Sequence, residues 1–175
     1  TGTYPLPEAQ KDRFLLRLLL KYPGRAEEEQ ILERMARSKP ALKVQKIASP
    51  EQILGARKAL DQLFLAPALQ QYVLDLVIAT RPGELKQLSA EQKSLAFNAA
   101  AAIEVGASPR AGIALILAGK AKALLSGRNY VIPEDIQAIA PAVLAHRLIL
   151  NFETEAKAIN ATQIVQQLLN AVKTP

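Results

Sequence analysis

The hydrophobic positions between residues 49 and 145 recur with the period of amphipathic α-helices, and this pattern predicts four helices. The helices begin at Pro50, Pro67, Pro109 and Pro133. Proline suits the first helical position, and Ser49 and Ser108 stand where N-caps are expected. Ile132 is a poor cap that loses ~1 kcal/mol relative to Ser or Thr. Because short turns join the helices, we expect a compact four-helix bundle.

The same pattern predicts the buried side of three of these helices. The expected core positions are Leu69, Val73, Leu76 and Val77, then Ile113, Ile116, Leu117 and Leu124, then Ile136, Ile139, Ala140, Val143 and Leu144. Gly127 follows the third helix at a position where a left-handed C-cap is favoured. These assignments place one continuous apolar core inside the bundle.

The chain before residue 49 has a different pattern. Pro7 and Glu8 begin a short helix, and residues 26–37 form another that starts with glutamates. The run from Phe14 to Leu20 is almost entirely apolar, which is typical of a buried parallel strand, although a helix is the alternative. No other segment offers a convincing neighbour strand. We prefer a strand whose sheet is missing, and expect it to be poorly packed or paired with a neighbouring molecule.

Two further regions have weaker signals. Residues 84–105 contain one capping box at Ser89 and an alanine-rich stretch, and the sequence does not fix their structure. After residue 147, apolar side chains alternate briefly, and a terminal helix follows. The apolar face of that helix consists of Ile164, Val165, Leu168, Leu169 and Val172.

Composition excludes several classes of function. The chain has no cysteine and one histidine, which argues against disulfides, His/Cys metal clusters and most nucleophile–base pairs. Its net charge of +6 comes from 22 basic residues scattered among 16 acidic ones, so we do not expect nucleic acid as a partner. No apolar run reaches the ~20 residues of a membrane span, and no signal peptide is visible. We therefore expect a cytoplasmic protein that does not associate with membranes.

Three side chains stand out chemically. Arg110 lies in the first turn of its helix, where a cation costs ~0.3–1 kcal/mol, so it either binds phosphate or pairs with a nearby acid. Arg13 lies between a short helix and the apolar run, where it either reaches across a subunit interface or pairs with Asp12. His146 lies at a helix end, where we expect a cation that caps the helix rather than a catalytic group.

Four stretches of sequence together resemble the MoxR family of AAA+ ATPases. They run from Gly2 to Phe14, Gly106 to Ala111, Gly127 to Asp135 and Ala142 to Arg147. They follow the family's order over nearly the whole chain. Two features depart from the family: residues 81–105 are longer than expected, and Ile132 replaces a Thr or Ser cap.

The resemblance implies a role for two arginines. Arg13 is expected to be the arginine finger, which acts in trans on the γ-phosphate bound by the neighbouring subunit. Arg110 is expected to be the second sensor, which contacts phosphate bound by its own subunit. The family's phosphate-binding loop, magnesium-holding motif and first sensor would all precede Thr1. We therefore expect a truncated piece, inactive alone and without a metal site, of a protein that binds ATP and magnesium.

This interpretation predicts a mainly all-α chain in three parts. Residues 1–47 are expected to be a remnant, one helix and one strand, of the α/β nucleotide-binding core; residues 48–146 the helical lid; and residues 147–175 a tail with a terminal helix. The intact protein would form a ring, expected to be a hexamer, and hydrolyse ATP to remodel or mature client proteins beside a von Willebrand A domain partner. The alternative is a non-enzymatic helical module, either an adaptor or a basic DNA-binding domain.

Overall fold

The computed structural model describes residues 6–39 and 44–175, which divide into two compact units. One unit combines the chain up to Arg17 with Ala59–Pro175, and the other is Leu18–Lys58. The first positions of the predicted MoxR-like pattern, residues 2–5, lie outside the described residues, as do residues 40–43. No helix in the described chain has the length and apolar character to cross a membrane.

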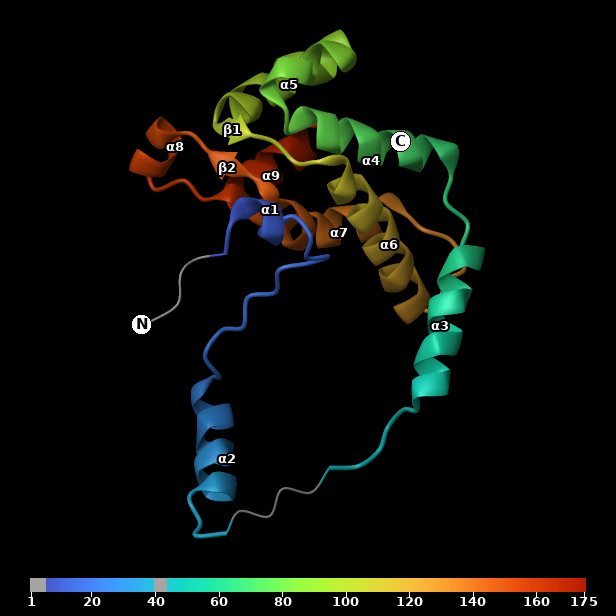
Figure 1. Cartoon of the computed structure of the whole chain (residues 1–175), viewed down its shortest axis with the longest axis vertical. Helices are drawn as coiled ribbons and strands as arrows, with labels where there is room; N and C mark the ends of the chain where they lie inside the picture. The colour runs from blue at the N-terminus through green and yellow to red at the C-terminus, as the bar shows by residue number, and fades with distance from the viewer. Residues whose placement is uncertain (1–5, 40–43) are drawn as a thin grey trace. The chain divides into compact units, whose positions relative to one another are not determined.

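The larger unit is helical, as predicted, with one small sheet (Figure 1). Its elements are α1 (Glu8–Lys11), the end of α3 (Pro50–Gln62), α4 (Pro67–Ala79), the 3-10 helix η1 (Pro82–Gln87), α5 (Ala90–Ala101), β1 (Ile103–Val105), α6 (Pro109–Leu125), α7 (Pro133–Leu144), the 3-10 turn η2 (Ala145–Arg147), β2 (Ile149–Leu150), α8 (Phe152–Ala156) and α9 (Ala161–Ala171). All four predicted helix starts are confirmed, and Gly127 has the expected positive φ of 73°. The sequence signals for helix starts were therefore sufficient to locate these four helices, but α3 has no buried residue and does not contribute to the core as predicted.

The helices α6 and α7 pack closely, and α6 does so through small residues. Its buried positions are Ala111, Ala114, Leu115, Ala118, Gly119 and Ala123. The predicted buried face of this helix was partly wrong: Ile116 and Leu124 pack against the core, but Ile113 is 61% exposed and Leu117 is 40% exposed. A Cβ at Gly119 would lie 2.5 Å from Ile136 Cδ1. Helix α7 therefore approaches α6 closely on the face of α6 that carries alanine and glycine.

The region of residues 84–105, whose structure the sequence did not fix, contains the end of η1, then α5 and β1. The strand β1 pairs antiparallel with β2, which joins this region to the chain after α7. Helix α9 then packs against α5 and α7, and its Ile164, Val165 and Leu168 are at most 2% exposed. This arrangement differs from the predicted division at residues 47/48 and 146/147, since the terminal helix lies in the same core as the bundle.

In the smaller unit, α2 (Arg25–Met35) has no buried residue, and neither does α3, which begins there and ends in the larger unit. The apolar run from Phe14 to Leu20 forms neither helix nor strand. Leu18 and Leu19 are each 71% exposed and Leu20 is 96% exposed. A strand needs backbone partners on neighbouring strands, and among the described residues none pairs with this run in a sheet.

Candidate functional site

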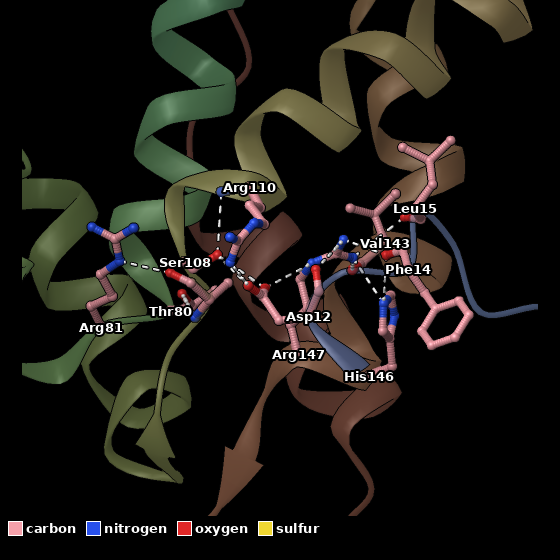
Figure 2. A network of polar contacts seen from close by, with 11 residues as sticks. Asp12, Phe14, Leu15, Thr80, Arg81, Ser108, Arg110, Val143, His146 and Arg147 are labelled. Carbon is pink, nitrogen blue, oxygen red and sulfur yellow. Dashed lines mark hydrogen bonds and ion pairs between the residues drawn. The ribbon is translucent and has the colours of Figure 1, made fainter. Parts of the chain in front are cut away.

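The Asp12 carboxylate, just after α1, is the centre of a polar cluster (Figure 2). Ser108 Oγ donates to it and lies 2.9 Å from each carboxylate oxygen. Arg110 Nη1 lies 3.0 Å from Oδ2, and Arg147 Nε lies 3.3 Å from Oδ1. One carboxylate thus joins the chain after α1 to the start of α6 and to the turn after α7.

Local packing fixes the backbone that leads into α6. A Cβ at Gly106 would lie 2.3 Å from the Thr80 carbonyl oxygen, so only glycine fits this close contact with the end of α4. The buried Thr80 hydroxyl accepts from the Ala107 N–H at 2.9 Å, and Arg81 Nε donates to the Ala107 carbonyl at 2.8 Å. Three successive contacts therefore determine where Ser108 and the first turn of α6 lie.

Arg110 occupies the second position of α6, after the N-cap Ser108, whose hydroxyl accepts from the Arg110 N–H at 3.2 Å. The unfavourable position of a cation at a helix N-terminus is balanced by the carboxylate of Asp12. The Arg110 side chain is nevertheless 60% exposed, whereas the Asp12 side chain is 18% exposed. The guanidinium is thus held by one carboxylate and remains open to a further anion from solvent.

Arg147 was present in the predicted motif from Ala142 to Arg147, but the sequence assigned it no role. Its side chain is 2% exposed. Beyond the Asp12 carboxylate, its two terminal nitrogens donate to backbone carbonyls. These belong to Asp12, Phe14, Leu15 and Val143. The only sequence signal for this role was an arginine directly after a predicted helix end in a family motif.

Arg13 lies next to this cluster without joining it. Its side chain is exposed, and it makes no ion pair or side-chain hydrogen bond with another described residue. The alternative of a simple Asp12–Arg13 surface pair is therefore not what the structure contains, because Asp12 is occupied by Arg110 and Arg147. Asp12 connects the two predicted site arginines, because its carboxylate contacts Arg110 and its backbone continues into Arg13.

Electrostatics keeps Asp12 ionised. Burial alone would raise the pKa of its carboxyl, but hydrogen bonds from Arg110 and Ser108 and the charge of Arg147 outweigh burial and lower it. The cluster therefore consists of one carboxylate between two guanidiniums, with an excess of positive charge on the exposed side.

The prediction that His146 caps its helix as a cation needs correction. Burial and the neighbouring Arg147 charge lower the pKa of His146, so the neutral imidazole is favoured. His146 Nε2 lies 2.9 Å from Arg147 Nη1 and 3.2 Å from the Phe14 carbonyl oxygen, so it accepts from the guanidinium in one tautomer and donates to the carbonyl in the other. The neutral imidazole thus contacts Arg147 and the Phe14 backbone, and it does not act as a cation that caps the helix.

The stretch from Gly127 to Asp135 is held together by an ion pair at the start of α7. Arg128 donates to both oxygens of the Asp135 carboxylate at 2.7 Å, and Asp135 also accepts from the Ile132 N–H at 3.1 Å. Asp135 is 2% exposed, and although its burial alone would raise the pKa, the hydrogen bond from Arg128 lowers it. The poor cap at Ile132 is thus compensated by a side chain one turn into α7.

In the described part of the chain, no group of three or more His, Asp or Glu side chains could hold a metal ion.

The chain is similar to known proteins over nearly its whole length. Residues 95–168 match the family described as the AAA lid domain. The chain is 37% identical over 174 residues to a protein named Chaperone MoxR1 from Mycobacterium tuberculosis, covering 99% of this chain and 44% of that protein. It is 35% identical over 174 residues to YeaC, an uncharacterised protein of Bacillus subtilis, covering 99% of this chain and 49% of that one.

A solved structure agrees as well. The crystal structure of a candidate ATPase from Cytophaga hutchinsonii has a TM-score of 0.86 and 38% identity, covering 100% of this chain and 51% of that chain. This chain spans about half the length of the curated relatives it matches. The chain belongs to the MoxR family of AAA+ ATPases, and residues 95–168 form its AAA lid domain.

Proposed function

We propose that this chain is the nucleotide-responsive lid region of an ATP-hydrolysing MoxR-type protein, with Arg110 as the second sensor in cis and Arg13 as the arginine finger in trans. The observation that carries the proposal is that Asp12 connects both arginines: its carboxylate contacts Arg110, which is 60% exposed, and the next residue is Arg13, which is exposed and has no ion pair among the described residues. The lid family and the MoxR relatives support this assignment, and none of the matches named above supports an adaptor or DNA-binding module.

Phosphate suits the exposed side of the cluster. Arginine binds phosphate and carboxylate oxygens with the same planar fork, so a guanidinium that already holds a carboxylate at 3.0 Å can also hold a phosphate. The start of α6 adds favourable partial positive charge for an anion. In this proposal Arg110 donates to a phosphate oxygen of ATP bound by its own subunit.

Arg13 has a different role. The Arg13 guanidinium is exposed and has no ion pair within residues 6–39 and 44–175, so it breaks no such contact when it reaches a second subunit. There it stabilises the negative charge that develops on the transferred phosphoryl group. Magnesium supplies charge neutralisation on the phosphates in such reactions, and the proposal assigns it to no residue of this chain.

An arginine that acts in trans requires self-assembly. We therefore propose a ring of subunits, expected to be a hexamer in the cytoplasm, that couples ATP hydrolysis to the remodelling of client proteins, with a von Willebrand A domain protein as a further partner. One relative is named a chaperone, and this name supports a role in remodelling other proteins. Mixed rings provide the direct test of the geometry, because only a trans residue can be complemented by another subunit.

ATP turnover by the full-length protein tests the assignment. Arg13→Ala should bind nucleotide normally and lose ~10³-fold or more in turnover. Arg110→Ala should lose nucleotide affinity. The exposed Arg17 in the same segment and Lys93 on α5 serve as matched controls whose alanine variants should turn over ATP normally.

A mixture of the Arg13→Ala protein with a phosphate-loop-disabled subunit should recover some turnover, because each supplies what the other lacks. Equal turnover by wild type, Arg13→Ala and Arg110→Ala would reject both assignments.

A further inference from the structure

The contacts of Asp12 are unequal, and this inequality suggests a role beyond holding the fold. On one side Arg147, whose side chain is 2% exposed, contacts the carboxylate and the backbone carbonyls of Asp12, Phe14 and Leu15. On the other side Arg110, whose side chain is 60% exposed, contacts only Oδ2 of the same carboxylate. The buried contacts exclude water and hold firmly, whereas an exposed ion pair contributes little and exchanges easily.

Removal of Arg110 from this cluster leaves Asp12 satisfied. The Ser108 hydroxyl still lies 2.9 Å from both carboxylate oxygens, and Arg147 Nε still lies 3.3 Å from Oδ1. The carboxylate therefore does not lose its last partner when an anion from solvent takes the guanidinium. A phosphate and the Asp12 carboxylate are two anions that compete for the same exposed donor.

The position of Asp12 in sequence gives this competition a consequence. Asp12 directly precedes Arg13, and Arg147 in the turn after α7 donates to the backbone carbonyls of Asp12 and Phe14 on either side of Arg13 (Figure 2). The Arg17 N–H also donates to the carbonyl of Ala142 in α7 at 2.9 Å. A change in how firmly the start of α6 binds Asp12 therefore changes the restraint on the next residue, Arg13, which is the proposed arginine finger.

We propose that Asp12 is a positioning residue that reports the state of Arg110 to Arg13. Without phosphate, its carboxylate occupies Arg110 and ties the Arg13 segment to the start of α6. When the phosphate of a bound nucleotide takes Arg110, the segment keeps its attachment through Arg147 but loses the tie to Arg110. This inference rests on the proposed function, because it assumes that Arg110 contacts phosphate.

Equilibrium binding of a fluorescent, non-hydrolysable ATP analogue to the full-length protein tests the competition without measuring turnover. Asp12→Asn keeps the size of the side chain and removes the charge. It should tighten binding roughly threefold, the effect expected from an exposed ion pair, and lower kcat at the same time. A residue needed only for folding would weaken both. Asp12→Glu, which keeps the charge, should move affinity and kcat back toward wild type.

The double variant separates the two proposals. If the competition exists, Asp12→Asn has no effect on affinity in an Arg110→Ala background. If Arg110→Ala alone binds the analogue like wild type, the sensor assignment fails. If Arg110→Ala weakens binding but Asp12→Asn binds like wild type or more weakly, the sensor assignment survives and the Asp12 inference is overturned.

A second measurement does not depend on the folding of an Asp12 variant. Amide hydrogen exchange in residues 12–17 of the wild-type full-length protein should become faster when the ATP analogue binds. The same segment should not respond in Arg110→Ala at a saturating analogue concentration. An unchanged segment in wild type, or an equal response in both proteins, would contradict the proposed link.

Discussion

Arg147 and Asp12 meet across 135 positions of sequence, with Arg147 Nε 3.3 Å from Oδ1 and Arg147 Nη2 3.3 Å from the Asp12 carbonyl oxygen. The guanidinium thus binds the side chain and the backbone of the same residue. This contact connects the segment after α1 to the turn after α7, and it is buried on the arginine side. It explains how a short helix of four residues is held on the lid.

Arg147→Met should be strongly destabilising, because it leaves backbone carbonyls without their donor and removes the buried one of the two guanidiniums that contact the Asp12 carboxylate. Breaking a buried pair costs ~3 kcal/mol, which lowers Tm by roughly 10 °C in a unit of this size. Thermal unfolding followed by circular dichroism measures the change. Arg147→Lys keeps the charge but loses the planar guanidinium, so its melting temperature should lie between those of wild type and Arg147→Met. Arg17 is exposed, and Arg17→Ala should unfold at the same temperature as wild type.

Gly106→Ala should disturb both stability and the candidate site. A Cβ there would lie 2.3 Å from the Thr80 carbonyl oxygen, and backbone cannot move aside as a side-chain end can. We expect a loss of about 3 kcal/mol in the free energy of unfolding and weaker nucleotide binding, because Arg110 follows on the displaced backbone.

Gly55→Ala is the matched control for this substitution. Gly55 lies inside α3 with nothing within 4 Å of an added Cβ, so alanine should stabilise its helix by ~0.5–1 kcal/mol. Urea unfolding of both variants measures the difference. Equal effects at the two glycines would show that the contact between Gly106 and Thr80 does not constrain the backbone.

The sequence predicted the helices well because their starts are encoded locally. Proline at the first position and a Ser cap before it act within four residues, and the caps at Ser49, Ser89 and Ser108 all form as expected. The buried face of α6 was mispredicted at Ile113 and Leu117 for the opposite reason. Which side faces α7 depends on how closely two helices approach, and alanine and glycine at that contact have no strong hydrophobic signal.

The candidate site was only partly predictable. Arg110 could be singled out because a cation at a helix start is locally unfavourable, but its partner Asp12 lies 98 positions away. No local pattern connects Asp12 to Arg147 or Arg110, since both contacts arise only when α1 folds back on the lid. The run from Phe14 to Leu20 was recognised as apolar, but a strand depends on neighbours that the described residues do not provide.

Asp135→Asn should weaken the start of α7. The carboxylate binds both terminal nitrogens of Arg128 at 2.7 Å and replaces the missing cap at Ile132, and it is 2% exposed. Asparagine can accept from one nitrogen only, so we expect a loss of ~2–3 kcal/mol, measured by urea unfolding. The neighbouring Glu134 is exposed, and Glu134→Gln should change stability by less than ~0.5 kcal/mol. Similar losses for the two variants would mean that the charge of the helix start, rather than the pair with Arg128, is what matters.

Stability should also fall in mild acid because of His146. Its pKa in the folded chain is lowered from about 6.5 by burial and by Arg147, so the unfolded chain takes up a proton at a higher pH than the folded chain does. The contribution of neutral His146 is therefore complete above about pH 6.5 and is lost as pH falls toward the lower, folded-state pKa. Asp12 and Asp135, whose pKa values are lowered from 3.8, lose their contributions only in a separate window below about pH 4.

His146→Gln isolates the first of these windows. Glutamine can still accept from Arg147 but does not titrate, and His146 is the only histidine in the 175 residues. The melting temperature of wild type should drop by a few degrees more than that of His146→Gln between pH 7 and pH 5, and the two curves should run parallel above pH 7. Parallel curves over the whole range would mean that His146 has the same pKa in the folded and unfolded chain, and that its contact with Arg147 does not favour the neutral imidazole.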